Sequence, residues 1–235
     1  MQKLFTASDR GADRLDWLDT RYSFSFAGWH DPSRMGFRSL RVLNEDRIAP
    51  GMGFGPHGHR DMEILTVVLE GALAHEDSSG AQAILRAGDV QRMTAGRGVV
   101  HSEWNASNEE ALHLLQIWIV PSARGAEPGH AEARGVFPVD KEGLEGLRRL
   151  VAPARNGGAL DIGQDAVVYA GRVIAGTPLD HPIEDGRGVF VHAVRGRLLV
   201  NGTPLETGDA LALEGQSELE FRADPSAEFL LFDLA

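Results

Sequence analysis

The sequence contains no cysteine among its 235 residues. Disulfide bonds, thiolate zinc sites and cysteine nucleophiles are therefore excluded. A chain of this length buries a sizeable core without such cross-links. The absence of cysteine also suits a reducing compartment. We therefore expect a cytoplasmic protein whose chemistry depends on other side chains.

Long apolar segments and an excess of positive charge are also missing. The longest apolar-rich stretch, HLLQIWIV at residues 113–120, is far shorter than the roughly 20 residues that span a membrane. The first residues, MQKLFTASDRGADRLDW, are polar and mixed in charge, so no signal peptide is expected. The formal net charge of −11 disfavours contact with phosphate backbones. Neither a membrane nor a nucleic acid is predicted as a direct partner.

Helical periodicity is scarce, whereas short apolar runs bounded by Gly, Pro, Asn or Asp recur along the chain. This pattern predicts an all-β barrel or sandwich. Asn201 and Gly202, between two apolar runs, predict a two-residue hairpin turn. One short helix is predicted over VDKEGLEGLRRL, residues 139–150, where Asp140 can cap it and leucines recur every three residues. Two glycines in this segment oppose a helix.

An internal repeat indicates two similar units. Residues 67–93 and 192–213 share one order: strand, glycine, strand, turn, strand, Gly-Asp, strand. The segment 121–160 is rich in Pro, Gly, Ala and charge, which is typical of a connection. We therefore predict an N-terminal metal-binding domain, residues 1–130, and a C-terminal metal-free domain, residues 131–235, with the helix in the connection.

Two pairs of potential metal ligands lie in the first unit. His57 and His59 are two residues apart, and so are His101 and Glu103. Side chains at i and i+2 share one face of a strand, so each pair can present both donors to one point. Three imidazoles and one carboxylate suit Fe, Mn, Co, Ni, Cu or Zn better than Ca or Mg. Four protein ligands on an octahedral ion leave two positions for a substrate oxygen and dioxygen.

The histidine pair alone carries little weight. Nine histidines give about 0.3 His-x-His pairs by chance, so two surface histidines in a polar turn remain an alternative. Glycines at positions 51, 53 and 55 favour the metal site, because they let the chain bend closely beside it. His113 alternates with apolar residues and is expected in the core. Five apolar residues are expected either to line a pocket or to pack in the core: Met52, Phe54, Met62, Trp104 and Trp118.

Two longer motifs carry a family resemblance. The pattern G-x5-H-x-H-x3-E-x7-G, residues 51–71, resembles the first cupin motif with one extra residue before the last glycine. The pattern G-x5-T-x-G-x4-H-x3-N, residues 88–105, resembles the second, with threonine where many cupins have proline. SFSFAGWHDP, MGFRSLRVLNED, GFGPHGHRDMEILTVVLEG, AGRGVVHSE and LHLLQIWI are similar to pirin-family sequences. The resemblance covers nearly the whole chain.

The pirin resemblance implies a bicupin: two tandem jelly-roll-like β-barrels, with one metal ion in the N-terminal one. Its ligand positions fall on His57, His59, His101 and Glu103. Glu63 competes, because it stands where many cupins have a glutamate ligand. Spacing alone does not separate the two glutamates. The pirin-like pattern assigns the metal to Glu103 and leaves Glu63 as a hydrogen-bond partner of a ligand.

Counting from the repeat's glycines compares the second unit with the first. This count puts Pro182 and Glu184 at the places of the first histidine pair, and Phe221 and Ala223 at those of the second ligand pair. The ligand set is lost there. The C-terminal unit is therefore predicted to hold no metal.

The resemblance also implies a function. It predicts quercetin 2,3-dioxygenase-like cleavage of a flavonol by dioxygen, with release of carbon monoxide. The cofactor is one divalent transition metal, with iron first among the candidates, and Glu103 is the catalytic base that takes a substrate proton. The alternative is a redox-responsive regulator or adaptor that binds a protein partner. A third option is another cupin reaction, such as sugar isomerisation.

Overall fold

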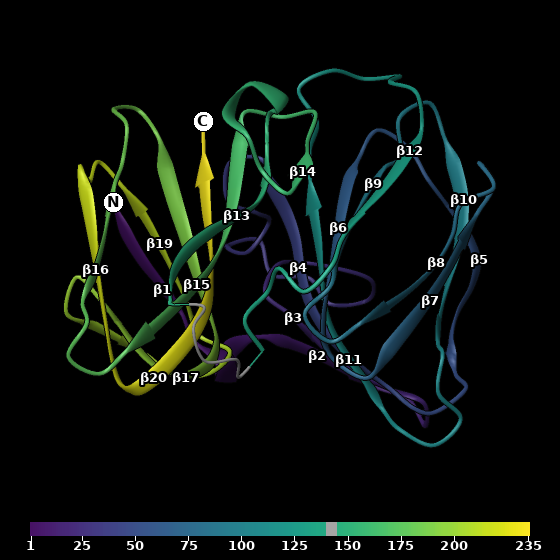
Figure 1. Ribbon diagram of the computed structural model, residues 1–235, viewed down its shortest axis with the longest axis horizontal. Coiled ribbons are helices and arrows are strands. Elements are labelled where there is room, and N and C mark those ends of the chain that lie inside the picture. Colours follow the sequence, from purple (N-terminus) through teal and green to yellow (C-terminus); the bar gives the residue numbers. More distant parts are fainter. Residues whose placement is uncertain (140–144) are drawn as a thin grey trace.

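The protein, described here by a computed structural model over residues 1–139 and 145–235, is almost entirely β-structure. Two strand assemblies lie side by side, an N-terminal one drawn mainly in blue and teal and a C-terminal one in green and yellow (Figure 1). Both are jelly-roll-like, as predicted. In the described ranges, however, their strand ladders stay open and do not close into barrels. No helix in these ranges is long and apolar enough to cross a membrane.

The N-terminal unit consists of two facing sheets. Its strands are β2 (Gly11–Arg14), β3 (Leu18–Tyr22), β4 (Leu40–Ile48), β5 (Gly53–His59), β6 (Glu63–Glu70), β7 (Ala72–Asp77), β8 (Gln82–Arg86), β9 (Val90–Thr94), β10 (Val99–Asn105), β11 (Leu112–Ile119) and β12 (Gly129–Ala133). One sheet has the order β12-β9-β6-β11-β4-β3-β2 and the other β5-β10-β7-β8. Strand β10 alternates buried and exposed side chains, so its inward residues face the interior between the sheets.

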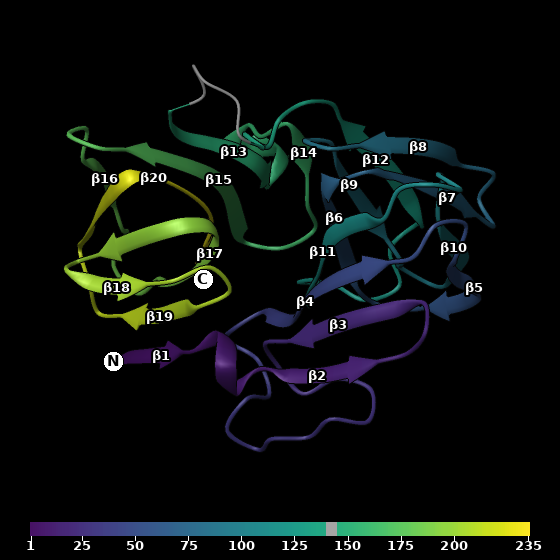
Figure 2. The same cartoon turned by 90° about the horizontal axis from the view of Figure 1, so that it is seen from below.

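The C-terminal unit is one branched sheet that curls on itself (Figure 2). Its strands are β1 (Gln2–Phe5), β13 (Gly146–Ala152), β14 (Leu160–Asp161), β15 (Ala166–Ile174), β16 (Leu179–Pro182), β17 (Gly188–Val200), β18 (Thr203–Leu205), β19 (Ala210–Glu214) and β20 (Glu218–Leu234). The main order is β1-β19-β17-β20-β15-β13-β14, with β16 on β20 and β18 on β17. Strand β1 thus belongs to the C-terminal sheet, and the domain boundary at 130/131 stays a prediction.

Two local predictions have opposite outcomes. The Asn201-Gly202 hairpin is confirmed: it joins β17 to β18, and both residues have positive φ, 47° and 76°. The predicted helix falls partly on residues 140–144, which lie outside the described residues. Residues 146–150 of the predicted helix lie in strand β13 (Gly146–Ala152), so the helix prediction is wrong there. Antiparallel pairing with β15 and burial of the end of β13 outweigh the leucine spacing. The described residues include two 3₁₀ turns, Ala7–Asp9 and Ala154–Asn156.

The apolar core is distributed unevenly. One cluster lies between the units and joins Leu43 and Leu115 of the first to Phe190 and Phe232 of the second. A second cluster fills the interior of the C-terminal unit. The N-terminal interior holds two small clusters instead. Its remaining interior is therefore available for polar side chains.

Strand register defines which positions of the two units correspond. Gly71 directly follows β6, and Gly196 lies inside β17 at a register shift, with φ of 77° and 76°. A side chain at either would overlap a backbone carbonyl of the facing segment. Past these glycines, Glu103 lies opposite His75 in the first unit, and Phe221 lies opposite Val200 in the second. Phe221 therefore corresponds to Glu103.

The same register corrects the count made from sequence. His101 pairs with His57 on β5, and Leu219 pairs with His181 on β16. One imidazole, His181, thus keeps the place of a ligand candidate, where the sequence count put Pro182. That count is off by one because the chain between this position and the glycine after it is one residue longer in the second unit. The count from the Gly-Asp turn is also wrong: Leu219 and Phe221, not Phe221 and Ala223, take the places of His101 and Glu103, because the chain after that turn is two residues shorter in the second unit.

Candidate metal centre

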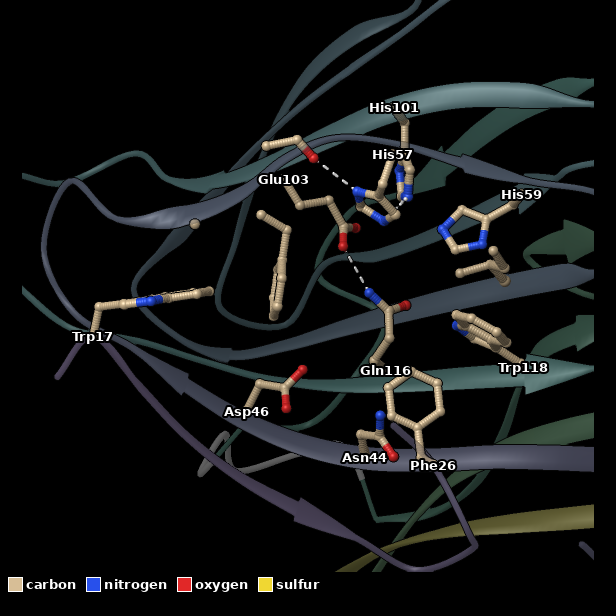
Figure 3. Close-up of a pocket in the computed structure, with 14 residues that line it drawn as sticks. Trp17, Phe26, Asn44, Asp46, His57, His59, His101, Glu103, Gln116 and Trp118 are labelled. Carbon is tan, nitrogen blue, oxygen red and sulfur yellow. Dashed lines mark hydrogen bonds between the residues drawn. The ribbon is translucent and has the colours of Figure 1, made fainter. Parts of the chain in front are cut away.

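Strands β5 and β10 bring the two predicted ligand pairs together. They pair antiparallel, with His57 directly opposite His101 and a register shift between His101 and Glu103. Gly53 makes this approach possible, because a Cβ there would overlap the backbone of Glu103. Figure 3 shows the three imidazoles gathered on one side of a cavity.

The three histidines form a compact donor cluster. The Nε2 atoms of His57 and His101 are 3.0 Å apart, and the ring of His59 lies 4.8 Å from each of the other two rings. Two nitrogens bound at right angles to one ion, each at about 2.1 Å, are separated by about 3 Å. The observed spacing therefore fits a transition-metal ion.

The electrostatics of the cluster favour neutral imidazoles. Burial, with a contribution from the neighbouring histidines, lowers the pKa of His59 to about 4 and that of His101 to about 3. Histidine binds metals only when neutral. The Nδ1 atom of His57 lies 2.8 Å from the carbonyl of Gly55. This contact places the ring proton on Nδ1 and leaves the lone pair of Nε2 for a metal ion.

Glu103 lies beside this cluster and is held by two polar neighbours. The side-chain amide of Gln116 donates to Oε2 at 2.7 Å, and the Thr66 hydroxyl donates to Oε1 at 3.3 Å. Burial raises the pKa of Glu103 to about 7. A second group of donors within 4.8 Å of one another contains Glu103, His101 and His75. His101 therefore belongs to both donor groups, while Glu103 is not grouped with the first histidine pair.

Glu63 lies elsewhere. Its Oε2 accepts a hydrogen bond from Thr94 at 2.8 Å, and its other oxygen approaches the backbone of Gly163. Burial raises its pKa. Among the described residues Glu63 belongs to neither donor group. Its contacts tie the N-terminal sheet to the segment around Gly163.

A cavity of about 410 Å³ opens in front of the histidines. Its apolar walls are Trp17, Phe26, Phe54, Ile64 and Trp118, and its polar walls are Asn44, Asp46 and Gln116. In Figure 3 Asn44, Asp46 and Phe26 lie across the cavity from the imidazoles. Burial raises the pKa of Asp46 to about 6. A flat, largely apolar molecule with a few polar groups fits such walls.

The sequence anticipated only part of this lining. Phe54 and Trp118 line the cavity, whereas Met52 and Trp104 are each 40% exposed. The polar wall was missed, although Asn44 and Gln116 interrupt the apolar runs of β4 and β11. A polar residue inside an otherwise buried strand is the signal that would have found them.

Two further histidines lie behind the site. His75 stacks on His130 with ring centres 4.7 Å apart, and its ring nitrogens lie 3.2 Å from Asp77 and from Gln91. Their sequence spacing gave no sign of this network, because His75 and His130 come from different sheets that face each other. His113 is buried and lies 2.9 Å from a carboxylate oxygen of Glu45, as expected for a core histidine.

Comparisons with family models and with known relatives agree on one family. Residues 5–119 match the family model described as Pirin, and residues 149–234 match the model described as Quercetinase C-terminal cupin domain. A relative from Escherichia coli named Quercetin 2,3-dioxygenase is 40% identical over 228 residues, covering 97% of this chain and 96% of the relative. A Pirin-like protein from Caulobacter vibrioides is 36% identical, covering 96% and 95%.

A solved structure agrees over the whole length. The crystal structure of a bacterial pirin from Escherichia coli in complex with nickel(II) has a TM-score of 0.93 and 40% identity, and the match covers 100% of this chain and 99% of that one. The motifs, the two jelly-roll units and these matches lead to one conclusion: the chain belongs to the pirin family, with two cupin domains.

Proposed function

We propose that this protein is a metal-dependent dioxygenase that cleaves flavonols such as quercetin and releases carbon monoxide. The observation that carries the proposal is the cluster of His57, His59 and His101 beside Glu103, at the wall of a cavity with several aromatic side chains. The names of the relatives support the same reaction.

The proposed ligands are His57, His59, His101 and Glu103, and the proposed ion is a divalent transition metal. Iron is the first candidate, with Mn, Co, Ni, Cu and Zn as alternatives. The 3.0 Å separation of two imidazole nitrogens and the neutral state of the rings support this choice. When bound, such an ion lowers the pKa of a coordinated hydroxyl and holds two reactants together.

The protein's own residues supply binding and proton transfer. The aromatic walls, including Phe26 and Trp118, enclose the planar rings of the substrate. Glu103 accepts the proton of the flavonol 3-hydroxyl, a role that its pKa of about 7 suits. Gln116 orients the carboxylate through its 2.7 Å hydrogen bond. The contacts of Glu63 with Thr94, away from the histidines, support Glu103 over Glu63 in this role.

The test combines metal analysis with product detection. Protein stripped of metal and reloaded with each candidate ion is given quercetin, and oxygen uptake and carbon monoxide are measured. We expect both signals with at least one ion. The His101→Ala variant is expected to lose the metal and both signals while its circular dichroism stays unchanged, and His30→Ala, an exposed histidine, serves as the control. Failure of every loaded form to release carbon monoxide would contradict the proposal.

A regulator or adaptor is the second candidate. The net charge of −11 favours contact with a basic protein surface over contact with a nucleic acid. A pull-down that depends on the redox state of the metal, together with absent flavonol turnover, would favour this function. The protein partner and the cytoplasmic location stay predictions.

A further inference from the structure

The C-terminal unit contains a cavity of its own, about 830 Å³ in volume. Register places it where the N-terminal unit has the cavity beside the metal centre. Asp233 lies opposite Val167 on β15, as Trp118 lies opposite Val42 on β4. Both Asp233 and Trp118 line their respective cavities. The volume lies within the range of small-molecule sites.

A buried charged cluster lines the inner part of this cavity. Arg187 donates to the carboxylate of Asp233, to Asp165 at 3.0 Å and to the Asp233 carbonyl at 2.8 Å. His181, 8% exposed, lies 3.4 Å from Asp233 and packs edge-on against the Tyr169 ring. Arg187 and Arg155, which lies 3.5 Å from Asp165, together offset the two carboxylates, so a ligand meets little net negative charge there.

The outer part of the cavity offers a positively charged group beside an aromatic wall. Arg149 lies over the Tyr169 ring, with its guanidinium carbon 5.9 Å from the ring centre. Its Nη1 donates to the Asn156 carbonyl at 2.9 Å, which holds the side chain at the rim. Within residues 1–139 and 145–235, no carboxylate forms an ion pair with Arg149. Arg155, also at the rim, lies 3.5 Å from Asp165.

The remaining walls are apolar or only weakly charged. Leu147, Val167, Pro182 and Ile183 provide apolar surface beside Tyr169. Glu184 is exposed at the edge, where water screens its charge. A planar ring against Tyr169 with an anionic group toward Arg149 satisfies both kinds of wall.

We propose that this C-terminal cavity binds a small aromatic carboxylate, with the ring packed on Tyr169 and the carboxylate paired with Arg149. The site is independent of the metal centre and of the flavonol reaction. It uses the same end of the jelly roll for a different chemistry, because its ligand is held by a guanidinium on β13 and not by a metal ion.

The test uses the metal-loaded full-length chain with benzoate as the probe. Backbone amide NMR spectra are recorded during titration with benzoate, with its neutral analogue benzamide, and with acetate, which lacks the ring. We expect benzoate to shift amides around Leu147, Tyr169 and Asp233, and the other two probes to bind at least about tenfold more weakly.

Matched variants localise the binding. Arg149→Gln removes the charge from an exposed side chain and is expected to weaken benzoate binding about tenfold or more, whereas Arg148→Gln, its exposed neighbour outside the cavity lining, leaves it within about twofold. Tyr169→Leu is expected to remove the preference for benzoate over acetate. Three results would each overturn the proposal. The first is no binding at a probe concentration of about 10 mM, taken as the upper limit for a functional site. The others are equal benzoate binding by the Arg149→Gln variant and amide shifts confined to the N-terminal cavity.

Discussion

The two halves of the molecule place different side chains at corresponding points of a shared strand layout. Strand β10 carries His101 and Glu103, and the matching part of β20 carries Leu219 and Phe221. The first pair lines a cavity with polar donors, whereas the second is fully buried in an apolar cluster. At these two positions one half thus supports a candidate metal site, and the other supports stability.

This division has a physical reason. A buried carboxylate and three neutral imidazoles are costly to bury without partners, so a site of this kind weakens the core around it. The N-terminal half accordingly has two small clusters where the C-terminal half has one large cluster. The shared cluster between the halves lets the well-packed half stabilise the other.

The largest expected effect comes from removing the base of the site. Glu103→Gln is expected to lower flavonol-dependent oxygen uptake by about 10²- to 10⁴-fold, because an amide does not accept the proton. Thermal stability is expected to change little. Glu76→Gln, an exposed residue on the neighbouring strand β7, is the matched control. Turnover by the Glu103→Gln protein within tenfold of the wild type would remove Glu103 from its proposed role.

Phe221, which takes the place of Glu103 in the C-terminal half, is expected to affect stability and not the metal. Phe221 stacks on Phe229 with ring centres 4.6 Å apart and is fully buried. Phe221→Ala is expected to lower the free energy of unfolding by about 3–5 kcal/mol, measured by urea denaturation, because it leaves a cavity. Metal content per folded chain stays unchanged. Ile84→Ala, at a side chain 51% exposed, is expected to cost far less. Loss of metal in folded Phe221→Ala would show that the halves are not separable in this way.

A smaller effect concerns acid stability. His192 in the C-terminal half is 1% exposed, its Nδ1 atom has no hydrogen-bond partner among the described residues, and burial lowers its pKa to about 3. Arg10 lowers this pKa further, and Glu45 opposes the shift. In the unfolded chain the pKa is about 6.5, so protons bind the unfolded state first as the pH falls below that value.

Stability attributable to a neutral His192 is fully present above pH 6.5 and is lost progressively as the pH falls toward 3, by about 2 kcal/mol at pH 5. His192→Leu is expected to remove that part of the acid sensitivity, which unfolding curves at pH 7.5 and 5 measure. An unchanged difference between the two pH values in the variant would show that His192 does not titrate in this way.

Local patterns in the sequence predicted the features that depend on neighbouring residues. Alternating faces predicted that His57 and His59 share one side, and the Asn201-Gly202 turn followed from its backbone preference alone. The all-β class followed from many short, turn-bounded strands, and the jelly-roll form followed from the family resemblance. The family resemblance chose Glu103 over Glu63, which spacing did not separate.

Features that depend on distant pairing were not predictable in the same way. β13 has leucines at helical spacing and becomes a strand because β15 lies beside it. The stack of His75 on His130 joins residues from two different sheets. The correspondence of His181 with His57 required the register of β16, because turn lengths differ between the units. Local propensity carries no information about such long-range contacts.

The pairing of β1 with β19 has a consequence for the order of events during synthesis. Phe5 pairs with Ala210, which the ribosome adds 205 positions later. The first strand therefore waits, with its backbone groups bonded to water, while almost all of the chain is made. β1 can pair only after β19 has been synthesised. A late step of folding therefore joins the N-terminal strand to the C-terminal sheet. Because such a distant closure is slow relative to local hairpins, attachment of this strand is expected to be among the last events of folding.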